Sequence, residues 1–541
     1  MENKNTILAL LLMLLVWTGF TFLFPSHEER EGGKTQVTAV SSDSAESVDA
    51  RKTQTTGNNN RQTESFSEVS SDTFKVREED KFVAFTNDVY SITFNLRGGV
   101  VSSIELLDYL QENFSDSLPV ALLDNKHDIS TLGLFSGGGF GLRGDESYSF
   151  TQHNKGSSQV VVLSTALDNG IMLSKTLTFW PDTYLINVHV ELENTGNMVL
   201  SDALQLKLNN YWHDDLAGNR FDYLGFTSYV DGKLHEDEIK DIQSAKKTYT
   251  GDISWSGYTD KYFLSALVNS DNVFDSVLLE RNGERISNTV RVSDLSIAPG
   301  AKESFNFDVY LGPKNIDYLG ASGKKLTEVV DFGFFAFLSK PLHMCLKFFY
   351  TFIHNYGIAI IILTVIIKLL FWPLTQKSYT SMRAMQTLQP EMKKLREKFR
   401  GDKEGLNRSM MELYKEHRVN PLGGCLPMLV QIPVFIALYK VLLGTIELRH
   451  APFAFWLTDL SVKDPYYITP IIMGATMFIQ QKMTPSTMDP MQAKMMLAMP
   501  VVFTFIFLNF PSGLVLYWLV NNLLTILQQY LIYRKPVSVK G

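Results

Sequence analysis

The sequence predicts a multi-pass α-helical membrane protein that also carries a large all-β domain outside the membrane. Charge is divided sharply along the 541 residues, with about −18 over residues 26–340 and about +11 over residues 341–541. In the first part, apolar residues recur with a period of two, as in half-buried strands. The second part alternates long apolar runs with short basic loops, which is the pattern of a membrane domain.

Residues 1–25 are predicted to form an N-terminal transmembrane anchor. An apolar run extends from Ile7 to Phe24, close to the shortest length that spans a bilayer. The alternative is a cleaved signal peptide, which requires small residues where this run instead ends in Phe22, Phe24 and Pro25. Residues 26–79 are rich in polar residues and poor in aliphatic ones, so we expect a flexible periplasmic linker.

Residues 80–330 are predicted to form an antiparallel β-sandwich. Between residues 184 and 193, apolar and polar side chains alternate, which buries one face of a strand. Turn sequences at Asp168-Asn169-Gly170 and at Asn282-Gly283 each indicate a hairpin. Trp212 and Trp255 could line a sugar or peptide cleft, but core packing is the expected role. No catalytic motif is found, so the chain is not expected to be an enzyme.

Five further apolar spans follow, which with the anchor give six predicted transmembrane helices. They cover residues 357–374, 424–443, 468–478 (extended by Gln480 and Gln481), 495–510 and 514–532. The tripeptide Pro511-Ser512-Gly513 leaves room only for a tight turn between the last two. Residues 331–356 are expected to form an interfacial amphipathic helix. Residues 357–535 then form the membrane core, and residues 536–541 form a tail.

Basic residues predict the orientation. Residues 377–418 hold about 11 Lys and Arg, whereas the loop 446–466 holds only Arg449 and Lys463. Both termini and the tail are therefore expected in the cytoplasm, and the β domain in the periplasm. Residues 378–419 are predicted to form a cytoplasmic helical hairpin with a single first arm over 382–399, broken at Gly401-Asp402. Either a solvated helix pair near anionic lipid or a docking platform fits this hairpin.

Lys368 is the most informative residue of the membrane part, because helical rise places it near mid-bilayer. A cation there costs at least about 2.5–3.5 kcal/mol unless it faces water or a partner. Thr364 lies on the same helix face, and Gln431, Asn521 and Asn522 could add polar lining. The alternative is that the Lys368 side chain extends to the cytoplasmic headgroups. Lys440 lies closer to the outer end of its span, and its side chain is expected to extend to the outer headgroups.

The membrane part resembles the YidC family of membrane insertases, including its mitochondrial and chloroplast relatives. The resemblance covers about residues 340–535 and rests on eight ordered strings, Thr364-Val-Ile-Ile-Lys368, Phe371-Trp-Pro-Leu-Thr375, Leu388-Gln-Pro390, Asn420-Pro-Leu-Gly-Gly-Cys425, Gln431-Ile-Pro433, Asp464-Pro-Tyr-Tyr467, Met488-Asp-Pro-Met491 and Phe510-Pro-Ser-Gly-Leu-Val-Leu-Tyr517.

The resemblance implies a five-helix insertase core around a hydrophilic groove that is closed outward, and a periplasmic β-supersandwich. The groove cation maps to Lys368, its polar neighbour to Thr364, and the substrate-contacting helix to Tyr517 and Trp518. Many relatives carry arginine where this chain has Lys368, and lysine lacks the fork that binds a carboxylate through two hydrogen bonds.

The resemblance also implies the function. The chain is expected to insert and fold integral membrane proteins of the bacterial inner membrane, as insertase and chaperone, alone or with the Sec translocon. Expected partners are nascent membrane proteins, membrane lipids, and a ribosome or targeting factor at the cytoplasmic loops. No cofactor or metal is expected. The alternatives are a solute or ion transporter, which predicts paired acidic residues in the spans, and a tethered carbohydrate enzyme, which predicts paired carboxylates in a cleft.

Overall fold

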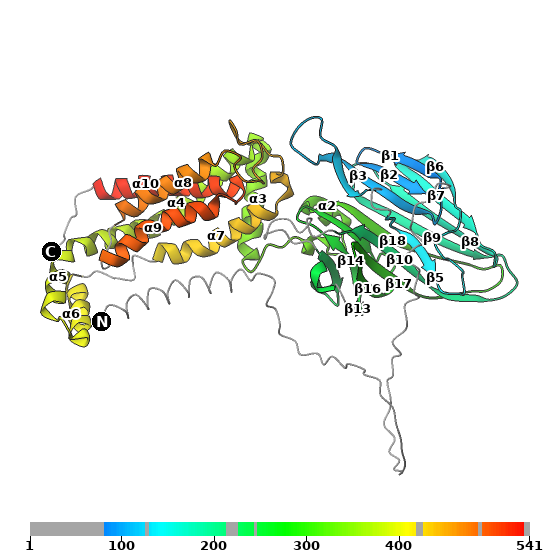
Figure 1. Cartoon of the computed structure of the whole chain (residues 1–541), viewed down its shortest axis with the longest axis horizontal. Coiled ribbons are helices and arrows are strands. Elements are labelled where there is room, and N and C mark those ends of the chain that lie inside the picture. Colours follow the sequence, from blue (N-terminus) through cyan, green and yellow to red (C-terminus); the bar gives the residue numbers. More distant parts are fainter. Residues whose placement is uncertain are drawn as a thin grey trace, which may run out of the picture. The chain divides into compact units, whose positions relative to one another are not determined.

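The computed structural model describes residues 80–124, 129–212, 225–242, 246–417, 426–484 and 490–534. These form an all-β region followed by a helical region (Figure 1). The predicted anchor at residues 7–24, the linker, Cys425 and the tail lie outside the described residues. Cys345 is described and is exposed.

The β region contains three antiparallel sheets. A four-stranded sheet has the order β1 (Phe82–Thr86), β2 (Tyr90–Asn95), β3 (Val100–Leu110), β4 (Pro119–Leu123). A five-stranded sheet has the order β13 (Lys247–Thr250), β16 (Phe274–Asn282), β17 (Arg285–Ile297), β10 (Leu200–Tyr211), β5 (Gly133–Ser136). A nine-stranded sheet has the order β12 (Lys233–Glu238), β11 (Gly225–Val230), β14 (Ile253–Thr259), β15 (Phe263–Val268), β18 (Lys302–Pro313), β9 (Leu185–Asn194), β8 (Ile171–Phe179), β7 (Ser158–Ala166), β6 (Ser149–Lys155).

The alternation predicted for residues 184–193 is confirmed in β9, where Ile186, Val188, Val190 and Leu192 are buried. Both predicted hairpins are also confirmed, since β7 pairs with β8 and β16 pairs with β17 across the expected turns. Strand alternation buries one face of each sheet, and the inward side chains form one continuous apolar core.

Trp212 and Trp255 belong to this core and are 3% and 0% exposed. Core packing is therefore confirmed for both tryptophans, and the alternative of a cleft lined by these rings is wrong.

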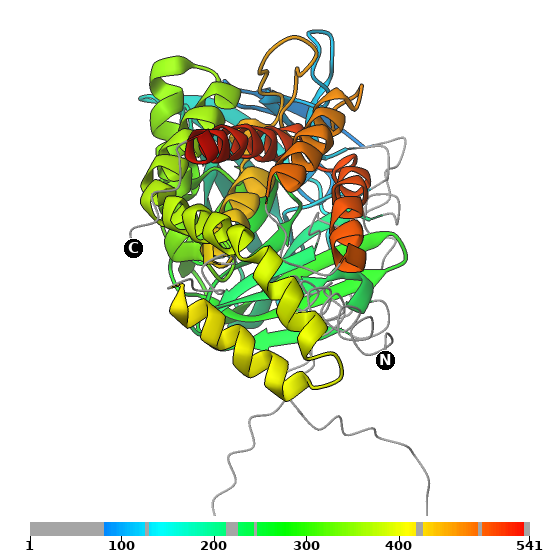
Figure 2. The same cartoon turned by 90° about the vertical axis from the view of Figure 1, so that its left-hand side faces the viewer.

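The helical region begins after two short elements, α2 (Ile316–Ser322) and the 3-10 turn η5 (Leu326–Val329). Its helices are α3 (Ala336–Ile353), α4 (Tyr356–Thr387), α5 (Gln389–Lys398), α6 (Lys403–Glu416), α7 (Leu426–Gly444), α8 (Ile468–Met483), α9 (Pro490–Phe507) and α10 (Ser512–Arg534). The 3-10 turn η7 (Ile446–Leu448) follows α7, and another, η4 (Ile239–Ile242), lies in the β region. Figure 2 looks along the bundle and shows α10 in red between yellow-green α4 and orange α8.

Within the described residues, α4 and α10 are long and apolar enough to cross a membrane. Two shorter apolar helices cover Gln431–Gly444 and Met495–Phe507, and α8 occupies the remaining predicted span. The multi-pass helical class is thus confirmed, while the count of six spans stays a prediction.

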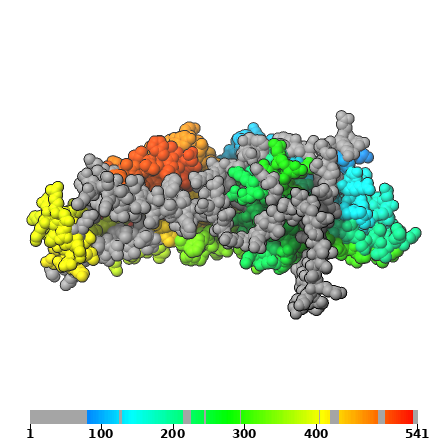
Figure 3. Space-filling view, turned by 60° about the horizontal axis from the view of Figure 1, so that its bottom comes forward, coloured from blue at the N-terminus to red at the C-terminus, as the bar shows by residue number. Residues whose placement is uncertain are grey.

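The first arm of the helical hairpin at residues 378–419 differs from the prediction. Residues 382–399 do not form a single helix, because α4 continues to Thr387 and α5 starts afresh at Gln389. Pro390 explains the break, since it has no backbone N–H to donate and favours the first turn of a new helix. The predicted break at Gly401-Asp402 is confirmed, because Gly401 has a φ of 104° and Asp402 caps α6. Figure 3 shows the surface of the α5–α6 hairpin in yellow.

Candidate functional site

The Lys368 side chain bridges α4 and α10 inside the helical region. Its ammonium donates a hydrogen bond of 2.6 Å to Thr525 Oγ1 and a longer one of 3.3 Å to Asn521 Oδ1. The residue is 8% exposed. The Lys368 ammonium therefore does not lie among aliphatic side chains alone, because both of its contacts are polar groups of α10.

Thr525 is itself oriented by its own helix. Its hydroxyl donates to the Asn521 backbone carbonyl at 2.7 Å, which leaves the oxygen lone pairs to accept from Lys368. An ammonium has three N–H donors, and these two contacts use two of them. Among the described residues, the third donor has no protein acceptor.

A small cavity of about 20 Å³ adjoins this ammonium. Three predicted site residues, Lys368, Gln431 and Asn521, line it together with Ile367, Phe371, Leu374, Thr375 and Val434. A volume of this size holds about one water molecule. Polar and apolar side chains both line this pocket, and it is narrower than the open groove that the family resemblance implies.

The remaining predicted site residues lie at different distances from the cavity. Tyr517 is 2% exposed and its hydroxyl hydrogen-bonds Gln431, so it supports the cavity wall indirectly. Thr364 is buried one turn before Lys368, and its hydroxyl donates to its own helix at Ile360 O. Trp518 packs instead against Phe435 and Phe507 in an aromatic cluster. The structure does not bring Thr364 or Trp518 to the cavity lining.

Sequence reasoning missed Thr525 and the two glutamines that follow it on α10. Gln528 Nε2 donates to Thr375 Oγ1 at 2.7 Å, and Gln529 Nε2 donates to Thr484 Oγ1 at 3.1 Å. The spacing of Asn521, Thr525 and Gln528 by four and three residues places them on one helix face. Such a polar row in an apolar helix was the available signal, since intramembrane polar groups need partners.

Lys440 has a partner that the sequence did not predict. Its ammonium forms an ion pair of 2.5 Å with Asp331. Asp331 lies in the segment before α3, which the sequence pattern did not connect with the span that holds Lys440. The pair adds a defined partner for Lys440, and its extension towards the headgroups stays a prediction.

Backbone hydrogen bonds fasten the loop 459–464 to the turn between α9 and α10. Ser512 N donates to Val462 O at 2.7 Å, and Gly513 N donates to Leu460 O at 3.0 Å. Asp464 accepts from Thr469 N at 2.7 Å and so holds the start of α8. The Asp464-Pro-Tyr-Tyr467 and Pro511-Ser512-Gly513 strings therefore have a structural role, because their hydrogen bonds join the loop before α8 to the turn before α10.

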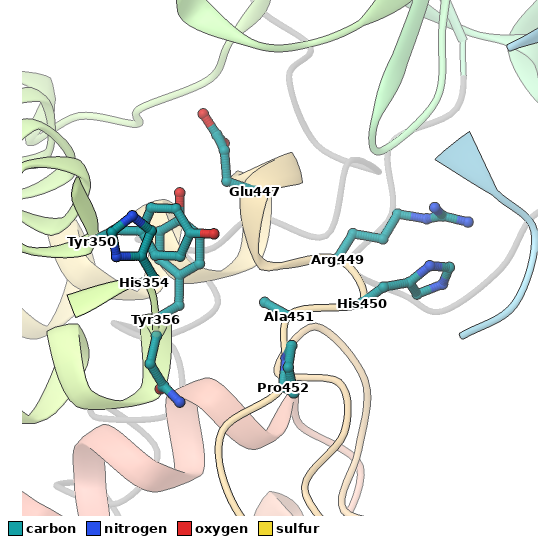
Figure 4. Close-up of a pocket in the computed structure, with 9 residues that line it drawn as sticks. Tyr350, His354, Tyr356, Glu447, Arg449, His450, Ala451 and Pro452 are labelled. Carbon is teal, nitrogen blue, oxygen red and sulfur yellow. The ribbon is translucent and has the colours of Figure 1, made fainter. Parts of the chain in front are cut away.

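A second and larger cavity, of about 210 Å³, lies where α3 and α4 meet the η7 loop (Figure 4). Tyr350 and Tyr356 stack with their ring centroids 3.9 Å apart on one side, while Arg449 and His450 extend away from them. Burial raises the pKa of the Glu447 carboxyl on its wall. Nearby, burial and Lys347 lower the pKa of His343 to about 4, so burial shifts the pKa of each group in the direction that favours its neutral form.

Among the described residues, no group of three or more His, Cys, Asp and Glu could hold a metal ion. The five helices α4, α7, α8, α9 and α10 contain no Asp, Glu or His in their sequences. The chemistry of the buried site is accordingly that of one cation with neutral hydrogen-bond acceptors, which can bind a carboxylate or a polar peptide group.

Two family models together match most of the chain. The model described as "YidC periplasmic domain" matches residues 82–345, and the model described as "60Kd inner membrane protein" matches residues 348–538. A membrane protein insertase YidC of Geotalea daltonii is 42% identical over 543 residues, covering 97% of this chain and 98% of the relative. Its counterpart in Geobacter sulfurreducens is 47% identical over 453 residues, covering 82% and 85%.

Solved structures are more distant. A crystal structure of an active YidC insertase is 16% identical, with a TM-score of 0.38, and the match covers 86% of this chain and 94% of that chain. A galactose mutarotase-like protein of Lactobacillus casei is 10% identical, with a TM-score of 0.32, over 43% of this chain and all of that one.

An all-β domain followed by apolar helices around a buried cation defines a class of protein, a polytopic membrane protein with a large extramembrane domain. The near full-length similarity then decides the family. The chain belongs to the YidC family of membrane protein insertases. A solute or ion transporter, the alternative raised by the sequence, is not favoured by these relatives.

Proposed function

We propose that this chain inserts integral membrane proteins into the bacterial inner membrane and that the Lys368 pocket receives the polar part of the substrate. The observation that carries the proposal is the ammonium held between α4 and α10 by two neutral acceptors, with a water-sized cavity beside it. A buried cation with an unused donor attracts an anionic group more strongly than it would in water.

The insertion step needs no nucleotide. The apolar segment of the substrate leaves sideways into lipid, and burial of its apolar surface drives the step. The polar tail passes the pocket, where Lys368 lowers the cost of its partial transfer. Widening of the one-water cavity that α4, α7 and α10 line is a required part of this mechanism.

Liposomes that contain the purified full-length chain test the proposal. The substrate is a short single-span protein whose exported tail carries Asp, compared with the same tail carrying Asn. We expect Lys368→Met to reduce insertion of the Asp form about tenfold, the value of one charge-assisted contact, and Lys368→Arg to retain most of it. Lys440→Met is the matched control, because that lysine pairs with Asp331 outside the pocket. Equal loss in the Lys368→Met and Lys440→Met variants would contradict the proposed role of the pocket.

The proposed orientation has the β domain in the periplasm and both termini in the cytoplasm. Support comes from the positive charge of the α5–α6 hairpin and the scarcity of basic residues in the loop 446–466. Cys345 offers a direct test, because it is exposed on α3. In a Cys425→Ser variant, a membrane-impermeant maleimide should label Cys345 from the periplasmic side. Labelling only after the inner membrane is opened would reverse the orientation.

The α5–α6 hairpin is the proposed docking site for a ribosome or targeting factor, and a Sec-type translocon is a proposed partner in the membrane. Leu388, Met392 and Leu413 bury the apolar faces of the two arms against each other. This packing leaves basic residues such as Lys393, Lys394 and Arg400 facing outward. Charge reversal at these three positions should reduce cosedimentation with ribosomes, while binding unchanged at physiological salt would exclude this surface.

A further inference from the structure

Two acceptors hold the Lys368 ammonium, and they differ in ways that assign them different roles. Thr525 Oγ1 lies 2.6 Å from Nζ, whereas Asn521 Oδ1 lies 3.3 Å away, beyond the usual range of a strong N–H···O contact. Thr525 is 2% exposed, and Asn521 is half-buried. Asn521 lines the cavity, and Thr525 does not.

We infer that Thr525 is a positioning residue that keeps the Lys368 ammonium aimed at the cavity, while Asn521 is the ligand that an incoming carboxylate displaces. This inference rests on the proposed function, because it assumes that Lys368 meets the substrate.

The geometry of Thr525 supports the anchoring role. Its hydroxyl hydrogen is committed to the Asn521 carbonyl, so its oxygen presents a lone pair in a fixed direction. A lysine side chain has a flexible four-carbon stem, and without a fixed acceptor its ammonium samples several positions. The bond to Thr525 selects the position from which the remaining donors reach the cavity.

The geometry of Asn521 supports the exchange role. Its contact with Nζ is long, and its side chain already lies at the cavity wall, where a substrate oxygen would arrive. An ionised carboxylate is a stronger acceptor for an ammonium than a neutral amide oxygen, so exchange at this position is favourable. Exchange at Thr525 would instead require a substrate to reach behind the ammonium into the closed seam between α10 and α4.

The experiment measures insertion of the Asp-tailed and Asn-tailed substrates in the same liposomes and takes their ratio. We expect Thr525→Val, which keeps the shape but removes the acceptor, to lower this ratio about threefold to tenfold, the range of one hydrogen bond. Thr525→Ser should restore it. Asn521→Ala should leave the ratio unchanged or raise it, because the substrate no longer competes with the amide.

Gln528→Met is the matched structural control. It removes a hydrogen bond to Thr375 in the same α4–α10 seam without touching Lys368. If Thr525 acted only through the seam, Thr525→Val and Gln528→Met would depress both substrates alike and leave the ratio unchanged, which overturns the inference. A greater loss of ratio in Asn521→Ala than in Thr525→Val would also overturn it, since Asn521 would then be the anchor.

Failure of the proposed function is a separate result. If Lys368→Met leaves the Asp-to-Asn ratio unchanged, the pocket does not select charge at all, whatever Thr525 does. If Lys368→Met removes the preference but Thr525→Val keeps it, the function stands and the positioning role of Thr525 is wrong.

Discussion

Among the residues that the structure describes, the β region buries Lys175 and the helical region buries Lys368, and the two regions hold the lysine in opposite ways. Lys175 of β8 donates to two backbone carbonyls, Gly99 O at 2.5 Å and Leu132 O at 2.9 Å. Lys368 of α4 contacts two side-chain oxygens beside a cavity. Both backbone acceptors of Lys175 are fixed, whereas one acceptor of Lys368, the amide of Asn521 on a separate helix, can turn away. A buried cation therefore indicates a binding site when one of its partners can be exchanged.

The largest effect is expected when the fixed lysine is removed. Lys175→Met leaves the carbonyls of Gly99 and Leu132 buried without a donor, which should lower the free energy of unfolding of the β region by about 2–4 kcal/mol. Hydrogen exchange of the β8 backbone amides, measured at increasing urea concentrations, gives this loss of unfolding free energy. Lys302→Met, at an exposed lysine near Glu191, is the control and should change little. Unchanged exchange in β8 would mean that Lys175 is not a structural anchor.

The two regions also differ in what one glycine of each packs against, which is fixed backbone for Gly257 in the β region and a replaceable side chain for Gly474 in the helical region. A Cβ added at Gly257 of β14 would lie 2.0 Å from the backbone oxygen of Ser265 on the paired strand β15, which cannot move alone. A Cβ added at Gly474 of α8 would lie 1.9 Å from the Thr504 hydroxyl of α9, a side chain that can be removed. We expect Gly257→Ala to cost about 3 kcal/mol and Gly474→Ala about 1–2 kcal/mol, within the range for overpacking.

Thermal unfolding of the two alanine variants measures these costs, and a double variant sharpens the contrast. Thr504→Ala should rescue Gly474→Ala, because it removes the colliding atoms. Substitution of Ser265 cannot rescue Gly257→Ala, since its backbone oxygen remains. Rescue in both cases, or in neither, would show that the two contacts are equivalent.

Stability of the β region should rise with pH in the mildly alkaline range. Burial lowers the pKa of Lys175 to about 7, below the value near 10.4 expected in the unfolded chain. Between these values the unfolded state binds a proton that the folded state has released, so the free energy of unfolding increases with pH, by at most about 1.4 kcal/mol per pH unit. Urea midpoints from pH 7.5 to 9.5 test this slope, and Lys175→Met should flatten it. An equal slope in that variant would assign the effect to other groups.

The smallest effect is expected at the Lys440–Asp331 pair. Both side chains are partly exposed, at 32% and 55%, so solvent screens their attraction. Asp331→Asn should lower the unfolding free energy by less than about 1 kcal/mol and leave insertion of both substrates unchanged. A double-mutant cycle with Lys440→Met isolates the pair energy. A coupling above about 2 kcal/mol would show that this pair, like that of Lys175, is a fixed structural contact.

Much of the fold was predictable because its signals are local. Alternation in β9 and the two turn sequences specify strands and hairpins within about ten residues of chain. Lys175 carried a signal as well, since it occupies an inward position of the alternating strand β8. The break at Leu388 was missed because a periodic apolar pattern runs through it, although Pro390 marked the boundary.

The sequence by itself determined which segments are strands or apolar helices and that Lys368 lies inside an apolar helix, since hydrophobic periodicity is a property of neighbouring residues. Only the tertiary structure decided which atoms meet that ammonium. Thr525 is 157 residues away along the chain, and its encounter with Lys368 depends on how α10 is rotated and placed against α4. Helix rotation is set by packing of whole faces, so no local pattern around Lys368 could distinguish Thr525 from the neighbouring polar residues of α10.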